Sequence, residues 1–208
     1  MKKLIAIASL SVLLSGCAGG GILTSTEPPQ TIYALRAAQN ADAAQSGPAR
    51  VVEIAKPTLP PGFETDRIAL YLDNGRTLDY YSGARWPDIL DAVIQDFTRR
   101  TVSSTLPYVV ATLPNQNQYA DYRLNMKLNE FQPVYGADAG AAPDLVVDAE
   151  FTLVALPGER IVQSFRLSER NAAASNNLES VAGGLEDILR RIEAEAFAKL
   201  DARLKGKR

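Results

Sequence analysis

The sequence predicts an α+β fold, with a mixed, mostly antiparallel sheet and two amphipathic helices packed on one of its faces. Three observations lead to this prediction. Apolar and polar residues alternate over several stretches, as they do in strands with one buried face. Two longer stretches change to a period near 3.6, which is typical of helices with one apolar stripe. Turn residues such as Asn-Gly separate neighbouring strand patterns, which favours antiparallel hairpins.

The first four predicted strands lie before residue 82. Residues 31–35 ("TIYAL") and 50–55 ("RVVEIA") are β-prone, and the polar loop 37–49 separates them. The next two strands, near 67–72 and 76–81, are joined by Asn74-Gly75, a pair that tolerates the positive φ angles of a tight hairpin turn. The proline-rich segment 56–66 predicts a connection without regular structure.

Residues 86–103 predict the first helix. Pro87 suits a first helical turn, and Asp88 and Asp91 would lie at the positive end of the helix dipole. The apolar residues recur at steps close to 3.6 and would form one buried face. This stripe consists of Trp86, Leu90, Val93, Phe97 and Val102.

The second half of the chain predicts three further strands after a short one at 107–113. Residues 121–135 form a long amphipathic pattern, and Phe131 is out of phase with it, which predicts a bulge or the end of the strand there. Residues 145–156 and 160–169 flank Pro157-Gly158-Glu159 and predict a long hairpin.

The last predicted element is a helix at 178–204. Gly183-Gly184 lies inside its pattern, and each glycine costs roughly 1 kcal/mol of helix stability relative to alanine. Either a close approach between the helix and the sheet, or a break between two helical pieces, would explain the pair.

The amino-terminal segment has the pattern of a secretory leader. Lys2 and Lys3 precede an apolar run at 4–14 that is too short to span a bilayer comfortably, and the small residues Ser15 and Gly16 follow. Cys17, the only cysteine in 208 residues, comes next. An ordinary signal peptide with a chance cysteine near its cleavage site is the alternative interpretation.

Composition argues against several classes of function. Removal of Lys2 and Lys3 with the leader leaves 20 of the 22 Lys and Arg against 24 Asp and Glu, a net charge of −4, whereas nucleic-acid binding requires a basic face. The chain has no histidine, so imidazole metal sites and Ser-His or Cys-His nucleophiles are excluded. We find no nucleotide-binding glycine loop and no paired catalytic carboxylates, and we interpret Asp144, Asp148 and Glu150 as solvated charges. We therefore predict no enzyme activity, no cofactor and no metal.

The segment around Cys17 resembles a bacterial lipobox, "LLSGC". The resemblance implies cleavage before Cys17, a diacylglyceryl thioether on its sulfur and acylation of the new amino terminus, which together would hold the chain on a membrane. Ala18 stands where an aspartate would resemble an inner-membrane retention signal, so the periplasmic face of the outer membrane is expected. We divide the chain into a signal peptide (1–16), a lipidated flexible tether (17–30) and one periplasmic domain (31–208).

Several ordered segments resemble the ABC-type transport auxiliary lipoproteins, a PqiC-like family. They are the lipobox, "YAL" at 33–35, "VVEIAKPTLPPGFETDRIAL" at 51–70 and "LDYYSGARWPDILDAVI" at 78–94. The resemblance implies an accessory role in an MCE-type ABC lipid transport system. The chain would be a docking adaptor for the MCE protein that bridges the periplasm, and it would hydrolyse nothing itself.

Aromatic residues and an arginine around the predicted hairpin are candidate partner-binding residues. Tyrosine, tryptophan and arginine are enriched at binding hot spots. The alternative is that Trp86 and some of the tyrosines belong to the core, although strand alternation would leave one of Tyr80 and Tyr81 exposed. The candidates are Tyr71, Tyr80, Tyr81, Arg85 and Trp86.

Two other functions fit the lipobox. The domain itself would hold a lipid, which requires an apolar cavity under the helix that starts at Trp86. Alternatively, the chain would be an envelope-assembly lipoprotein that stimulates cell-wall synthesis. The sequence does not indicate which lipid is transported or in which direction. It does not indicate the oligomeric state either.

Overall fold

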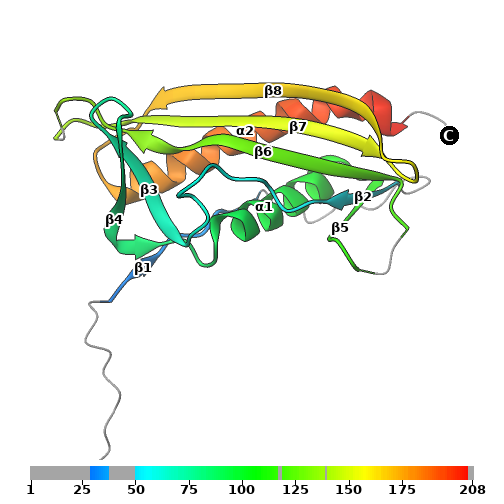
Figure 1. Cartoon of the computed structure of the whole chain (residues 1–208), viewed down its shortest axis with the longest axis horizontal. Coiled ribbons are helices and arrows are strands. Elements are labelled where there is room, and N and C mark those ends of the chain that lie inside the picture. The colour runs from blue at the N-terminus through cyan, green and yellow to red at the C-terminus, as the bar shows by residue number, and fades with distance from the viewer. Residues whose placement is uncertain (1–28, 38–49, 117–118, 139, 206–208) are drawn as a thin grey trace, which may run out of the picture.

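The computed structural model describes residues 29–37, 50–116, 119–138 and 140–205. They form a curved sheet of eight strands with two helices against it (Figure 1), so the α+β prediction with a mixed sheet is confirmed. The strands are β1 (Thr31–Ile32), β2 (Arg50–Ile54), β3 (Arg67–Leu72), β4 (Thr77–Arg85), β5 (Val109–Thr112), β6 (Tyr122–Val134), β7 (Asp144–Ala155) and β8 (Arg160–Ala172). The helices are α1 (Leu90–Thr105) and α2 (Leu178–Lys205).

Strands β6, β7 and β8 form a long antiparallel meander. The alternation predicted for β6 is confirmed, because Leu124, Met126 and Leu128 are buried while Lys127 is exposed. A β-bulge between Leu128 and Glu130 shifts the register and brings Phe131 back to the buried face, as its position out of phase predicted. The β7–β8 hairpin is likewise confirmed.

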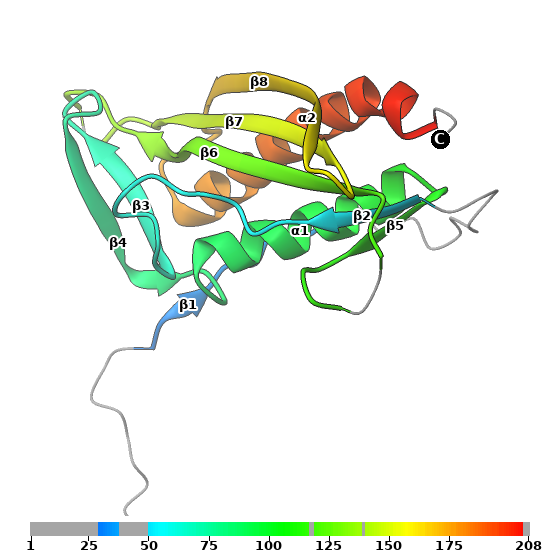
Figure 2. The same cartoon turned by 45° about the vertical axis from the view of Figure 1, so that its right-hand side comes forward.

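The other edge of β6 is shared by two groups of strands (Figure 2). At the start of β6, β2 pairs with it in parallel and β5 continues the sheet beyond β2. At the end of β6, Val134 pairs with Tyr71 of β3, and β4 and β1 continue from there. These parallel pairings were not predicted, because they join segments far apart in the chain and no local turn residue indicates them.

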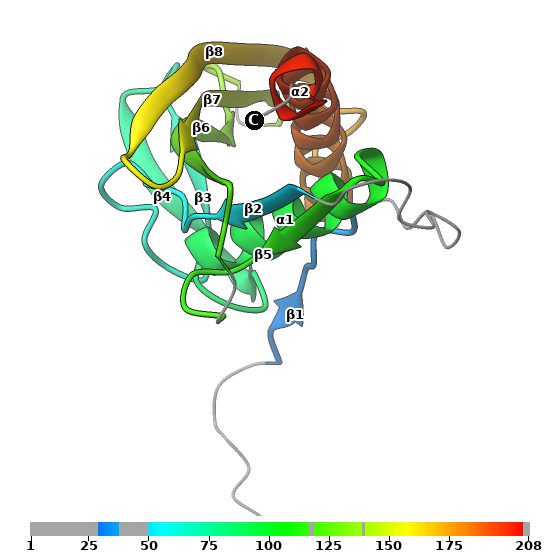
Figure 3. The same cartoon turned by 90° about the vertical axis from the view of Figure 1, so that its right-hand side faces the viewer.

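Both helices lie on the concave side of the sheet, which curves around them (Figure 3). Helix α2 packs on β7 and β8, whereas α1 packs on β5 and β2 and also contacts α2. The predicted apolar stripes face this core, which includes Ile94 and Phe97 of α1 and Leu185 and Leu189 of α2, each at most 1% exposed. Burial of these side chains is the main force that holds the two layers together.

The prediction that the first helix starts at residue 86 was wrong, because α1 begins at Leu90. Pro87 disfavours helical backbone at the residue before it. Trp86 instead lies in the connection between β4 and α1, and its N–H donates to the carbonyl of Asp66 at 2.7 Å. Strand β4 extends to Arg85 rather than ending near 81.

The first strand is shorter than predicted. Only Thr31 and Ile32 pair, in parallel with Ala84 and Arg85 of β4, while Tyr33 and Leu35 pack against the core without strand pairing. The signal peptide, Cys17 and the proposed tether up to residue 28 lie outside the described residues, as does nearly all of the predicted loop 37–49.

Helix α2 runs without a break through Gly183-Gly184, so the interpretation as a close helix–sheet approach is the correct one. A Cβ atom on Gly184 would lie 2.3 Å from Cδ1 of Leu145 in β7. A Cβ atom on Gly183 would have no neighbour within 4 Å among the described residues, so it would lie in open space.

Candidate partner-binding surface

The five predicted partner-binding residues lie at different depths. Trp86 is in the core with 2% of its surface exposed, and its ring centroid lies 6.0 Å from that of Phe131. Tyr71, Tyr80 and Tyr81 are half-buried and pack against the core, and only Arg85 is exposed. The expectation that one of the two adjacent tyrosines would be exposed was wrong.

Hydrogen bonds account for the partial burial of the two adjacent tyrosines. The hydroxyl of Tyr80 donates to the carbonyl of Gly62 at 2.7 Å, and the guanidinium of Arg67 lies 3.9 Å from the centre of its ring. The Tyr81 hydroxyl is 2.7 Å from that of Tyr135. Burial and this hydrogen bond raise the pKa of Tyr81, so its phenol stays protonated.

A chain of hydrogen bonds that the sequence did not indicate extends from this cluster. Beyond Tyr81, the Tyr135 hydroxyl donates to Oδ1 of Asn176 at 2.8 Å, and Nδ2 of Asn176 donates to the carbonyl of Gly140. The chain thus joins β4, the end of β6 and the connection that leads into α2. No local pattern signals this chain, because its partners are far apart in the sequence. Tyr81 and Tyr135 are 54 residues apart, and Tyr135 and Asn176 are 41 residues apart.

Arg85 is exposed beside the first described residues of the chain. Its Nη1 lies 3.5 Å from Oδ2 of Asp66, and its carbonyl accepts a 2.9 Å hydrogen bond from the N–H of Tyr33. Three residues after Tyr33, the N–H of Arg36 donates to Oε2 of Glu186 in α2 at 2.7 Å, while Arg190 of α2 donates to the Arg36 carbonyl at 3.0 Å. The segment after the proposed tether is therefore fastened to both the sheet and a helix.

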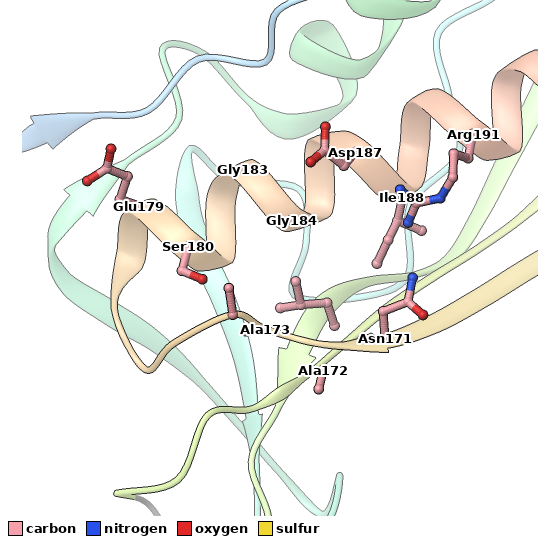
Figure 4. Close-up of a pocket in the computed structure, with 12 residues that line it drawn as sticks. Asn171, Ala172, Ala173, Glu179, Ser180, Gly183, Gly184, Asp187, Ile188 and Arg191 are labelled. Carbon is pink, nitrogen blue, oxygen red and sulfur yellow. The ribbon is translucent and has the colours of Figure 1, made fainter.

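A shallow groove lies where the first turns of α2 pass the end of β8 (Figure 4). Its volume is about 420 Å³. The floor consists of small or apolar residues, among them Ala173, Gly183, Gly184 and Ile188, and charged side chains stand around it (Figure 4). One of these, Arg191, holds Glu169 through its Nε and Nη2 at 2.6–3.2 Å.

A larger groove of about 730 Å³ lies at the opposite end of the sheet, beside the connection between β5 and β6. Glu53 on its wall is paired with Arg123, whose Nε lies 2.6 Å away, and Arg123 also contacts Glu159 at 3.0 Å. Through these contacts, Arg123 of β6 links β2 to the turn between β7 and β8. Tyr119, on the rim, is fully exposed.

The three carboxylates that we interpreted as solvated all lie on β7, and one of them is buried. Asp148 was predicted to be solvated, but it is 4% exposed and lies on the outer face of β7, where Arg166 and Asn129 donate to it at 2.5–2.9 Å. Burial alone would raise its pKa, but these hydrogen bonds outweigh that effect and lower it. Asp144 instead pairs with Arg170 at 3.1 Å.

Two further findings concern the described part of the chain. It contains no group of three or more His, Cys, Asp or Glu residues arranged to hold a metal ion. None of its helices is both long enough and apolar enough to cross a bilayer.

Comparison with known proteins identifies the family. Two crystal structures share the fold, each with a TM-score of 0.67 over 83% of this chain and 99% of theirs. One is protein XCC0632 from Xanthomonas campestris, at 20% identity, and the other is an uncharacterized protein at 14% identity. The sequence matches no curated protein. It does match the family model for the ABC-type transport auxiliary lipoprotein component over residues 33–196, so the chain belongs to this family.

Proposed function

We propose that this chain is an outer-membrane lipoprotein that serves as a docking adaptor for the periplasm-spanning MCE protein of an ABC lipid transport system. Residues 1–16 would be removed as a signal peptide, Cys17 would carry the lipid, and residues 17–30 would connect it to the domain at 31–208. The family membership supports a transporter as partner. The MCE protein and the outer membrane are the more specific parts of the proposal.

The fastening of the segment 29–37 is the observation that carries the adaptor role. Immediately after the proposed tether, β1 pairs with β4, and Arg36 is held by two side chains of α2. A force on the lipid anchor would therefore pass directly into both layers of the domain. Such a connection suits a protein that holds a partner at a membrane.

A non-enzymatic role is consistent with the polar residues of the described segments. Several buried or half-buried carboxylates are paired with cations or hydroxyls, as Asp148 is with Arg166 and Asp91 with Lys56. The alternative that the domain holds a lipid has less support. It requires a cavity under α1, and Trp86, Phe97 and Phe131, each at most 3% exposed, occupy that space.

Partner contact is best placed on the β3–β4 hairpin. Arg85 and the edges of Tyr80 and Tyr81 are accessible there, and the hydrogen-bond chain through Tyr135 links them to the connection before α2. Arginine and tyrosine at such a site supply charge-assisted hydrogen bonds and apolar contact together.

The test is co-purification. The full-length chain is expressed with an affinity-tagged MCE protein encoded beside a permease and an ATPase, and complexes are isolated from detergent-solubilised membranes. We expect the lipidated chain to be retained, the variant Arg85→Glu to be retained several-fold less, and Arg203→Glu at the end of α2 to behave like the unmodified chain. Absence of any association while the lipid is intact would contradict the adaptor role.

A further inference from the structure

In the described part of the chain, three of the four exposed large hydrophobic side chains belong to segments along one margin of the domain. Among the described residues, four large hydrophobic side chains are classed as exposed: Ile32 at 55%, Ile89 at 43%, Tyr119 at 102% and Ile161 at 63%. Ile32 ends β1, Ile89 precedes α1, and Tyr119 lies in the connection between β5 and β6. Ile161 is at the start of β8.

The three segments that hold Ile32, Ile89 and Tyr119 share one level of the molecule. In Figure 1, β1, the connection between β4 and α1, and the connection between β5 and β6 form the lower margin of the described domain. Figures 2 and 3 are turned about the vertical axis, which leaves height unchanged, and the same three segments are lowest in both. They therefore lie along the margin of the described domain that is opposite β8.

Strand pairing brings two of these residues to the same end of β4. Ile32 is the register partner of Arg85, and Ile89 follows Arg85 by four residues through the buried Trp86. Two of the cations nearby are paired with carboxylates, and Asp88 accepts a backbone hydrogen bond. Arg85 faces Asp66 at 3.5 Å, Lys56 pairs with Asp91 at 3.0 Å, and Oδ1 of Asp88 accepts the N–H of Ile89.

We infer that this side of the domain lies on the bilayer that holds the acylated Cys17, with Ile32, Ile89 and Tyr119 in the interfacial zone. The inference rests on the lipid anchor of the proposed function. Residue 29 follows Cys17 by 12 residues, a contour of at most about 40 Å. The chain enters the domain at β1, on this same side, so it reaches the membrane without passing around the body.

The chemistry of the three side chains suits an interface. Isoleucine gains from removal of apolar surface from water, and tyrosine places its ring among acyl chains while its hydroxyl stays hydrated. Three side chains bind a membrane weakly on their own. A covalent anchor keeps them at high effective concentration near the surface, so that weak contacts suffice to orient the domain.

This orientation has a consequence for docking. The turn between β3 and β4, residues 73–76, is at the upper side of the domain in Figures 1 and 2, opposite β1. It would project into the periplasm. Arg85, at the other end of β4, would lie near the membrane, so the partner contact proposed at Arg85, Tyr80 and Tyr81 would run along the hairpin from its membrane end.

Depth measurements on the lipidated mature chain test the inference. The chain is reconstituted into vesicles of phosphatidylethanolamine and phosphatidylglycerol that contain nitroxide-labelled lipids. Because the thioether uses up the thiol of Cys17, a cysteine introduced by Ile32→Cys, Ile89→Cys or Tyr119→Cys carries the only fluorescent label. Ile161→Cys is the control, since its 63% exposure lies between those of Ile89 and Tyr119 and it lies on the β7–β8 hairpin.

We expect nitroxide lipids to quench the labels at positions 32, 89 and 119 at least twofold more than the label at 161. Equal quenching at all four positions, with the protein floating with the vesicles, would overturn the orientation and leave the anchor in place. Failure to float would overturn both. Neither result depends on MCE binding, so co-purification remains a separate test. Because all four positions are exposed, circular dichroism should be unchanged in every variant.

Discussion

The carboxyl Oε1 of Glu193 in α2 lies 2.6 Å from the hydroxyl of Thr98 in α1, and none of the Glu193 surface is exposed. Thr98 has one hydroxyl proton, and the carbonyl of Ile94 also lies within 2.8 Å of it. A protonated Glu193 resolves this arrangement, because it donates to Thr98 while Thr98 donates to Ile94. Burial raises the pKa of Glu193 to about 8, although the hydroxyls of Thr98 and Thr101 favour the charged form.

This pair predicts that the domain loses stability as pH rises from about 4.5 to 8. In that range the unfolded chain releases the Glu193 proton and the folded chain keeps it, so each pH unit lowers the free energy of unfolding by up to about 1.4 kcal/mol. Below the unfolded value both states are protonated, and above about pH 8 both are charged, so the contribution levels off at each end. Urea unfolding at a series of pH values measures the slope.

The variant Glu193→Gln removes the titrating group and keeps its size. We expect it to be more stable than the unmodified chain at pH 8 and to show a flatter pH profile. Glu195→Gln is the control, because Glu195 is two residues away, exposed, and paired only with Lys199 at 3.2 Å among the contacts of the described residues. A Glu193→Gln variant that keeps the original slope would show that another group causes it.

The two adjacent glycines of α2 predict opposite effects of alanine. Gly183→Ala places its methyl group in open space and gains helix propensity, so the free energy of unfolding should rise by up to about 1 kcal/mol. Gly184→Ala drives its methyl group against the buried Leu145, and overpacking should lower the free energy of unfolding by about 1–3 kcal/mol. Thermal unfolding compares them, and equal effects would contradict the close approach of α2 to β7.

Asp148 should stabilise the outer face of the sheet more than its neighbour Asp144. Asp148→Ala removes charge-assisted hydrogen bonds to Arg166 and Asn129 and should cost about 2 kcal/mol. Asp144→Ala breaks an exposed ion pair with Arg170 and should cost less than about 1 kcal/mol. Since the pKa of Asp148 is lowered, its contribution is present at neutral pH and is lost at acidic pH. Guanidinium unfolding at neutral pH measures both variants, and similar costs would contradict this ranking.

The fluorescence of Trp86, the single tryptophan, reports directly on the burial of its ring. Its ring is buried against Phe131, so iodide should quench its fluorescence weakly in the folded chain and strongly after unfolding in guanidinium. The emission should also remain unchanged when an MCE partner binds, because a partner at the hairpin cannot reach the indole. Strong iodide quenching of the folded chain would show that the ring is accessible.

Local patterns predicted most of the elements correctly. Asn74-Gly75 between two β-prone runs identified the β3–β4 hairpin, because the turn needs positive φ angles, here 57° and 89°. The alternation of β6 and its break at Phe131 followed from one buried face. The start of α1 was missed because the apolar stripe included Trp86, although Pro87 keeps that residue out of a helix.

The candidate site was harder to predict than the elements. Residue type correctly drew attention to the hairpin aromatics, but depth depends on what packs over them. Tyr80 and Tyr81 are both half-buried because Gly62 and Tyr135 hold their hydroxyls. Cys17 and its lipid lie outside the described residues, so lipidation stays a prediction from the lipobox.

Short-range information was thus enough for the kinds of elements, their order and the hairpins, because propensity, period and turn chemistry act over a few neighbouring residues. The parallel pairing of β2 and β3 with β6, the curvature around two helices and the chain from Tyr81 to Asn176 needed the folded chain. These features join segments that are tens of residues apart, and only the competition among all possible long-range contacts for burial and hydrogen bonds selects them.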